Sequence, residues 1–205
     1  MQLYFAPGVC SLASHIALRE AGAQFDLVRA DIKAHKLADG ADFYAVNSKG
    51  SVPVLRLDDG QLITEGPAIL QYIADRHPAA KLAPPNGTLE RTRVQEWLNF
   101  VTSELHKTFT PLFDQTADPK VKEYYQKLLF RKLDWLNVAL AGKTYLTGND
   151  FTIADAYAFV VINWTNLVGV DLAKWPAIQA FQARVASRPA VQDALEAEGL
   201  VKKAA

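Results

Sequence analysis

The chain has very little sulfur. Its 205 residues include one methionine and one cysteine, Cys10. A single cysteine cannot form an internal disulfide, which fits a reducing compartment, so we expect a cytoplasmic protein. The first residues alternate like a β-strand, without the basic segment and apolar run of a signal peptide, so none is predicted.

The sequence also lacks an excess of charge and a long apolar run. Lys plus Arg and Asp plus Glu both number 22, so the formal net charge is +0 at pH 7. No overall field therefore attracts nucleic acid or an anionic membrane. The richest apolar stretch, residues 156–162, is too short to span a bilayer. We expect no nucleic-acid partner, no membrane partner and no metal site.

What the sequence does contain is enough apolar residues for a sizeable core. Half of its residues are hydrophobic, which makes disorder improbable at this length. The first part alternates strand and helix signals in the order βαβ and then ββα, which predicts a small α/β domain. The expected strands cover residues 2–5, 25–30, 54–57 and 61–64, and the expected helices cover 11–22 and 66–76.

A segment rich in proline and alanine, residues 79–87, interrupts every periodicity and predicts a linker. The domains are then residues 1–78 and residues 88–205. Helix signals recur throughout the second domain, which should be an all-helical bundle. The expected helices run from 88 or 90 to 108, 119 to 141, 152 to 168, 176 to 187 and 189 to 198.

Residues 51–69 have the features of a docking site for a peptide-like ligand. Pro53 enters a strand, where proline is tolerated only at an edge or an end. The N–H and C=O of Val52 could therefore face outward and pair with an extended peptide, and a cis bond before Pro53 would hold them rigidly. Glu65 and Gly66 stand at an expected helix start, where free N–H groups bind a carboxylate and the Glu65 side chain accepts from an ammonium. A hairpin with an edge proline, followed by a capped helix, is the purely structural alternative.

Several short segments along the chain occur together in a recognisable order. They are YFAPGVCSLA at 4–13, SVPVL at 51–55, TEGPAI at 64–69, WLNF at 97–100, SELHK at 103–107, FTPLF at 109–113, FTIADAY at 151–157 and AEGL at 197–200. In this order the chain resembles the glutathione transferases of the bacterial beta class, nearly end to end. The resemblance implies a thioredoxin-like N-terminal domain that binds glutathione as co-substrate, followed by a helical C-terminal domain.

Cys10 is the candidate reactive residue. It follows a Pro-Gly turn where a strand gives way to a helix, and a helix N-terminus stabilises a thiolate. An inert core position is the alternative for a lone cysteine. The resemblance implies that Cys10 contacts the glutathione sulfur and forms a mixed disulfide with it, with Ser11 beside it as a hydroxyl donor. Because Ala13 replaces the second cysteine of a Cys-x-x-Cys pair, the mechanism is expected to be monothiol.

His106 is the second titratable candidate. It shares an expected helical face with Asn99 and Ser103, because spacings of three and four residues bring side chains into one row. Such a row is more often only the solvated side of a helix. The resemblance implies that His106 points towards the thiol region, and that Asn99, Ser103 and Glu104 reach the γ-glutamyl end of glutathione across a dimer interface. A homodimer is therefore implied by the resemblance.

One position departs from the family pattern. The family usually places a lysine where this chain has His35, to meet the glycyl carboxylate of glutathione, and a neutral imidazole supplies one hydrogen bond without a charge. Lys33 or Lys36 could supply the missing charge.

Another histidine, His15, is expected to have a surface or capping role. In all, the resemblance assigns glutathione binding to Cys10, His35, Val52, Pro53, Glu65, Gly66, Asn99, Ser103, Glu104 and His106.

Two further groups of residues have expected roles. Thr152 and Asp155 have the spacing of a capping box, in which each side chain bonds to the other's backbone, and we take both as structural. Just beyond His106, the apolar residues Phe109, Leu112 and Phe113 could wall a pocket for an apolar second substrate.

We therefore predict a glutathione S-transferase that adds the glutathione thiol to small apolar electrophiles, as in detoxification of xenobiotics. The reaction class is nucleophilic attack by a thiolate. A first alternative is glutathione-dependent thiol-disulfide exchange, peroxidase or reductive dehalogenase activity, which would yield oxidised glutathione in place of a thioether. A second alternative is a glutathione-binding or scaffold protein without activity, because a fold does not determine a function.

Overall fold

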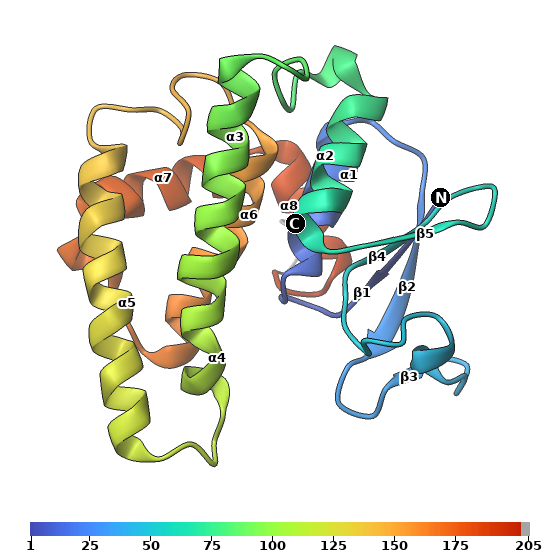
Figure 1. The fold of residues 1–205 in the computed structure, drawn as a ribbon, viewed down its shortest axis with the longest axis horizontal. Helices are drawn as coiled ribbons and strands as arrows, with labels where there is room; N and C mark the ends of the chain where they lie inside the picture. Colours follow the sequence, from blue (N-terminus) through green and yellow to red (C-terminus); the bar gives the residue numbers. More distant parts are fainter. Residues whose placement is uncertain (202–205) are drawn as a thin grey trace. The chain divides into compact units, whose positions relative to one another are not determined.

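The computed structural model describes residues 1–201, which form two compact units (Figure 1). The first unit comprises Met1–Ala83 and the segment from Ser187 onward, and the second comprises Pro84–Ala186. This differs from the expected second domain, 88–205, because helix α8 (Pro189–Ala197) packs against helix α1 (Ser11–Glu20) of the first unit. The first segment of the first unit thus ends within the expected linker, at Ala83, and the last helix belongs to this same unit.

The first unit is built on a five-stranded mixed sheet in the order β3-β2-β1-β4-β5. Strand β1 pairs in parallel with β2 and antiparallel with β4, and β4 continues antiparallel to β5. The expected βαβ-ββα order is confirmed, with the two-residue strand β3 added between the two halves. The strands are β1 (Gln2–Phe5), β2 (Asp26–Asp31), β3 (Lys36–Leu37), β4 (Val54–Arg56) and β5 (Leu62–Thr64).

Both faces of β1 are covered, which is why this strand is an almost continuous apolar run. Successive side chains of a strand point to opposite faces. The ring of Phe5 lies 6.4 Å from the ring of His15 on α1, whereas the ring of Tyr4 lies 6.1 Å from that of Phe43. Phe43 belongs to the short 3-10 helix Phe43–Ala45 and is fully buried. The core of the first unit therefore has two layers, one on each side of β1.

Helix α2 (Gly66–Arg76) lies against both α1 and the strands β4 and β5. It begins and ends where the sequence predicts. Pro67, at an early helical position, has no N–H to satisfy, and Glu65 is the residue that precedes the helix. The short 3-10 helix Pro78–Ala80 follows near the end of the unit.

The described part of the second unit is helical, as expected. Helix α5 (Pro119–Leu140) packs on α4 (Lys107–Phe113) and α7 (Pro176–Ala186), and α7 also packs on α6 (Ile153–Asn163). The expected apolar row of α5 is confirmed, since Leu129, Leu133, Leu136 and Leu140 are its buried residues. The other helical segments are α3 (Leu89–Asn99), a π-helical segment (Phe100–His106) and 3-10 helices at Trp164–Val168 and Leu172–Lys174.

The start of α6 is held by a buried carboxylate. The Oδ2 of Asp155 accepts from the amide and the hydroxyl of Thr152, both at 2.8 Å, and Oδ1 accepts from the Leu146 amide at 2.8 Å. This is a capping box with a third donor from the preceding loop. Asp155 is fully buried, so these hydrogen bonds offset its lost hydration.

We predict that Asp155→Ala lowers the free energy of unfolding by about 3 kcal/mol, because it leaves three buried donors without an acceptor. The matched control is Asp171→Ala, which removes an exposed carboxylate that caps a short helix by accepting from the Ala173 amide. The control substitution should lower the free energy of unfolding by less than about 1 kcal/mol. Urea unfolding of both variants gives the comparison, and equal losses would show that the Asp155 contacts carry no special weight.

Candidate active site

Cys10 lies at the junction between β1 and α1. It directly precedes the first residue of α1, and its thiol donates to the carbonyl oxygen of Val52 at 3.2 Å. The chain enters this position through Gly8, whose φ of 72° lies in the left-handed region that favours glycine. A sulfur at a helix N-terminus is stabilised as thiolate by the helix dipole and the unpaired amides. The expected helix-terminal placement of Cys10 is therefore confirmed.

Ser11, next to Cys10, is fully buried. Its hydroxyl donates to the carbonyl oxygen of Ala6 and accepts from the Ala6 amide, both at 3.2 Å. The hydroxyl thus joins the end of β1 to the start of α1. This geometry gives Ser11 a structural role, which replaces the expected role of a hydroxyl donor to the ligand.

The segment before β4 has the cis proline that the sequence predicts, although Val52 itself is buried. The Val52-Pro53 peptide bond is cis, and β4 begins only at Val54, so Val52 is outside the strand ladder. Its carbonyl accepts from Cys10, while its amide bonds to no other group within residues 1–201. One unpaired backbone donor therefore lies next to the Cys10 thiol, which is the arrangement that an extended peptide ligand requires.

The start of α2 forms a charged corner. Glu65 has a φ of 70°, a left-handed conformation that is rare outside glycine. Its carboxylate pairs with the ammonium of Lys49, which also donates to the Thr64 hydroxyl at 2.9 Å. Lys49 was not found from the sequence, because no spacing links it to Glu65. At Gly66 a Cβ would lie 4.0 Å from the Pro53 ring, so this corner adjoins the cis bond.

His35 is held rigidly by its neighbours. It also has a left-handed backbone, with a φ of 53°, and its ring stacks on Tyr44 with centroids 4.4 Å apart. A Cβ at Gly50 would lie 2.8 Å from Nδ1 of His35, so only glycine permits this packing. Nδ1 is buried and has no hydrogen-bond partner in the described residues, which leaves Nε2 as the nitrogen able to donate to a ligand.

The expected polar row on the helix is changed by the π-helical segment. A π-helix has a wider turn than an α-helix, so side chains four residues apart stay aligned and those three apart diverge. Asn99 and Ser103 therefore keep their row, and the Ser103 hydroxyl donates to the Asn99 carbonyl at 2.9 Å. Asn99 and Ser103 are exposed, whereas His106 is only partly exposed and contacts Tyr157, so the three do not share one exposed face as expected. Glu104, in the same segment, is half exposed and pairs with Lys132.

His106 is anchored by aromatic residues of the second unit. Its Nδ1 lies 2.7 Å from the hydroxyl of Tyr157, and its ring meets the Trp164 ring edge-on at 4.7 Å. Burial, and to a lesser degree the charge of Lys107, lowers the pKa of His106 to about 4. The imidazole is therefore neutral at physiological pH. The contacts of Tyr157 and Trp164 with His106 are not visible from sequence spacing.

The apolar residues beyond His106 separate into two environments. Phe109 is buried and stacks on Phe113, whose ring is partly exposed, and both meet Trp164 edge-on, with centroids 5.5–5.8 Å apart. These rings form an apolar wall next to His106. Leu112 instead lines a hollow of about 470 Å³ together with residues such as Val170.

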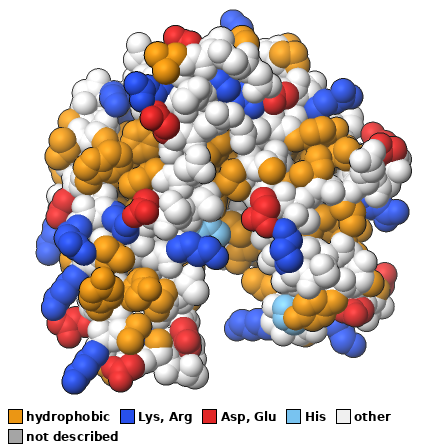
Figure 2. Space-filling view, in the orientation of Figure 1, with side chains coloured by type: hydrophobic (Ala, Val, Ile, Leu, Met, Phe, Trp, Pro, Cys, Tyr) orange, Lys and Arg blue, Asp and Glu red, His pale blue; other side chains and the backbone are white. Residues whose placement is uncertain are grey.

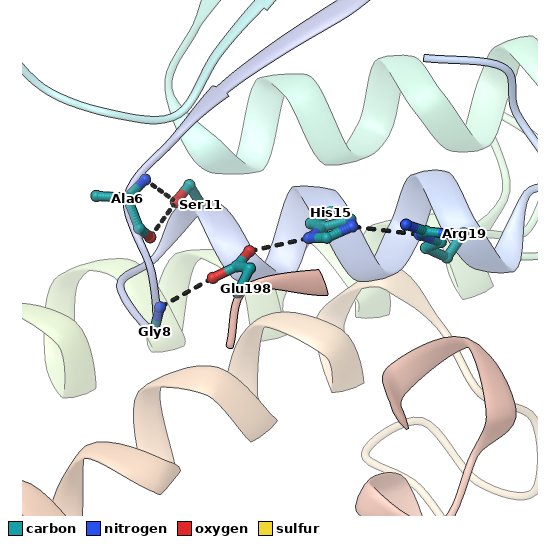
Figure 3. Close-up of polar contacts among 6 residues, drawn as sticks. All are labelled: Ala6, Gly8, Ser11, His15, Arg19 and Glu198. Atoms are coloured by element: carbon teal, nitrogen blue, oxygen red, sulfur yellow. Dashed lines mark hydrogen bonds and ion pairs between the residues drawn. The ribbon is translucent and has the colours of Figure 1, made fainter. Parts of the chain in front are cut away.

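A buried polar network runs behind the Cys10 turn (Figure 3). Glu198 accepts from the Gly8 amide at 2.9 Å and contacts Nδ1 of His15 at 2.9 Å, while Arg19 donates to Nε2 of His15 at 3.2 Å. The side chains of His15 and Glu198 are fully buried. The expected surface or capping role of His15 is therefore wrong, because its side chain is fully buried. Its partner Glu198 lies 183 residues away in the sequence, so no local pattern indicates the contact.

Basic and acidic side chains are interspersed over the face drawn in Figure 2. Across residues 1–201, no group of three or more His, Cys, Asp or Glu side chains could hold a metal ion. In the same range, every helix is too short or too polar to cross a bilayer.

Comparison with known proteins places the chain in a family. The model of the glutathione S-transferase N-terminal domain matches residues 1–75, and that of the C-terminal domain matches residues 100–189. The chain is 48% identical to glutathione S-transferase GstA of Escherichia coli O157:H7, over 98% of this chain and 100% of the relative.

Two solved structures are similar to this chain over their whole length. A sphingomonad glutathione S-transferase complexed with glutathione has a TM-score of 0.94 at 46% identity, covering 98% of this chain and 100% of that chain. The bacterial beta class enzyme of Sphingomonas chungbukensis has a TM-score of 0.95 at 47% identity, with the same coverage. The chain therefore belongs to the glutathione S-transferase family, in its bacterial beta class.

Proposed function

We propose that this glutathione transferase binds glutathione on its first unit and adds the glutathione thiol to small apolar electrophiles, as a detoxification reaction. The observation that carries the proposal is the unpaired Val52 amide beside the Cys10 thiol. A tripeptide whose cysteinyl residue pairs with Val52 brings its own sulfur close to Cys10. The direct test is to incubate the protein with glutathione and 1-chloro-2,4-dinitrobenzene and to measure the thioether. Formation supports the proposal, and a rate no higher than the uncatalysed one contradicts it.

The remaining ligand groups find partners on the same unit. The γ-glutamyl carboxylate is assigned to the Gly66 amide at the start of α2, and its ammonium to Glu65. The glycyl carboxylate is assigned to His35, with Lys33 or Lys36 as supplementary cations. Contacts connect these residues, because Cys10 touches Val52, the Pro53 ring adjoins Gly66, and Lys49 pairs with Glu65. Ligand binding would then draw Glu65 away from Lys49.

On the family resemblance, His106 and the apolar residues beyond it are the further proposed site residues. A separation of 2.7 Å is typical of a hydroxyl donor, so Tyr157 is assigned as the donor to Nδ1. The proton of the neutral ring then lies on Nε2, and we assign His106 as a hydrogen-bond donor to the glutathione thiolate. That thiolate forms a bond to the electrophilic carbon, and the leaving group departs with its electron pair. Of the three expected pocket residues, Phe113 is the one proposed to face the electrophile, with Phe109 buried behind it, whereas Leu112 lines the separate hollow.

Reductive chemistry is a second candidate, favoured by the helix-terminal position of Cys10. The Cys10 thiolate would attack one sulfur of oxidised glutathione, forming a mixed disulfide and releasing one glutathione thiolate. In a turnover experiment, oxidised glutathione and not a thioether would be the product formed with a peroxide or a halogenated substrate.

The lone cysteine also supports the proposed reducing, cytoplasmic location.

We also propose a homodimer in which Asn99, Ser103 and Glu104 serve the neighbouring chain's site. All three side chains are exposed in the monomer. An aromatic group adjoins them, since the rings of Phe100 and Trp135 lie 4.7 Å apart and Trp135 is 52% exposed. Exposed aromatic clusters of this kind are typical of protein interfaces.

We predict that Cys10 forms one mixed disulfide with oxidised glutathione, because its position favours the thiolate and no second cysteine can resolve the adduct. Intact mass after incubation should increase by one glutathionyl group, and Cys10→Ser should show no increase. Wild-type protein without an adduct, and unreactive towards alkylating agents at neutral pH, would refute the assignment.

We predict that His106 stays neutral from pH 8 down to about pH 5, because burial holds its pKa near 4. NMR titration of its ring, assigned by comparison with His106→Gln, should show no protonation in this range. Since the pKa is lower in the folded chain than the usual 6.5, the stability that this group contributes is lost as pH falls from about 6.5 towards 4. A midpoint near 6.5 in the folded protein would contradict the donor role.

We predict that Asn99→Ala weakens glutathione binding by about tenfold without loss of stability, because a hydrogen bond to a charged ligand group is worth roughly 1.5–3 kcal/mol. Calorimetric titration should be paired with light scattering, which should give the mass of a dimer. The control Asn166→Ala removes an equally exposed amide that bonds only locally to Asn163. A monomer in which Asn99→Ala binds at full strength would exclude the shared site.

A further inference from the structure

The turn that carries Cys10 is fixed at two points. On one side, Ser11 bonds to both backbone groups of Ala6. On the other, Glu198 accepts from the Gly8 amide at 2.9 Å, whereas the turn's own hydrogen bond, from the Val9 amide to the Ala6 carbonyl, is long at 3.5 Å. Figure 3 shows both contacts at the end of the turn. The hydrogen bond to Glu198 is therefore shorter than the turn's own hydrogen bond and stabilises the outer part of the turn more strongly.

Glu198 comes from the opposite end of the chain. It follows the last residue of α8, and the next turn of chain places Leu200 against Gly8, where a Cβ on Gly8 would lie 3.3 Å from the leucine side chain. Two residues of this C-terminal segment thus touch one glycine. The left-handed φ of Gly8 and this close approach both exclude a larger residue.

The hydrogen-bond roles in the network follow from its chemistry. An arginine N–H can only donate, so Nε2 of His15 is the acceptor for Arg19. The single proton of the ring is then on Nδ1 and is donated to Glu198. The chain of bonds runs from the Arg19 cation through a neutral His15 to the Glu198 carboxylate and ends at the Gly8 amide (Figure 3). Each buried polar atom in this chain of bonds has its partner, as burial requires.

We propose that Glu198 is a positioning residue for Cys10. By holding the Gly8 amide it fixes the turn that places the thiol at the N-terminus of α1 and against the Val52 carbonyl. His15 and Arg19 act through Glu198, because they fix the orientation of its carboxylate. The inference rests on the proposed reactive role of Cys10, and it makes the C-terminal segment part of the device that sets thiol reactivity.

Positioning and simple electrostatics predict opposite results. A nearby negative charge disfavours a thiolate, so removal of the Glu198 charge alone would lower the thiol pKa and speed alkylation at neutral pH. Loss of positioning withdraws the helix N-terminus from the sulfur, which raises the thiol pKa. It also withdraws the Val52 carbonyl, which accepts from the neutral thiol, and this loss offsets only part of the rise. The direction of the change therefore identifies the cause.

The experiment measures iodoacetamide alkylation of Cys10, the one thiol of the full-length chain, by intact mass from pH 5 to 9. In Glu198→Gln, an amide replaces two acceptors with one acceptor and one donor, so one of the two buried bonds is lost. We expect the rate at pH 7 to fall by about tenfold, corresponding to a rise of roughly one unit in the thiol pKa. An unchanged or faster rate would overturn the proposal.

A matched control separates positioning from stability. Glu20 pairs with Arg188, which lies just before α8, so Glu20→Gln removes another ion pair between α1 and the C-terminal segment without touching the Cys10 turn. The alkylation rate of Glu20→Gln should stay within about twofold of the wild-type rate, even where its melting temperature falls as far as that of Glu198→Gln. An equal fall in both variants would mean that loosening of α8 alone is responsible, and the proposal would fail.

A milder variant covers the case in which Glu198→Gln does not fold. Arg19→Met removes the exposed end of the network and leaves Glu198 in place, so it should slow alkylation in the same direction by about threefold. Hydrogen exchange of the Gly8 amide should accelerate in this variant and not in Glu20→Gln. If wild-type Cys10 proved unreactive, its proposed reactive role would be wrong. Unchanged exchange of the Gly8 amide in Arg19→Met would refute the positioning role of Glu198 separately.

Discussion

The contact between the Cys10 thiol and the Val52 carbonyl is the constraint on which the rest of the site depends. It joins the start of α1 to the segment before β4, two places 42 residues apart in the sequence. Because Val52 precedes a cis proline, its amide stays outside the sheet and next to the sulfur. One contact thus brings a helix N-terminus, a thiol and an unpaired backbone donor together.

The surrounding residues fix this junction from several directions. Ser11 ties it to β1, Glu198 ties the preceding turn to the C-terminal segment, and the start of α2 at Gly66 adjoins the Pro53 ring. Two left-handed residues, His35 and Glu65, are strained conformations of the kind that occur at binding sites. In the second unit the same principle holds, since aromatic packing and burial keep His106 neutral and its ring fixed.

Local patterns were sufficient to predict most elements and some of the site. The bounds of α2, the apolar row of α5 and the cis bond before Pro53 followed from helix, spacing and proline signals within a few residues. The π-helical segment and the two-residue β3 left no such signal. Contacts between distant residues were also hidden, since neither the pairing of His15 with Glu198 nor that of Lys49 with Glu65 follows any periodicity. Ser11 was misjudged because its burial depends on the packing of the whole first unit.

The most direct test of the account is a crystal structure of the protein with S-methylglutathione, which cannot form a disulfide. The account predicts that the ligand's cysteinyl carbonyl accepts from the Val52 amide at about 2.9 Å and that its sulfur lies against Cys10. It also predicts that the γ-glutamyl carboxylate meets the Gly66 amide. A ligand bound elsewhere, or bound with the Val52 amide still unpaired, would contradict the central claim.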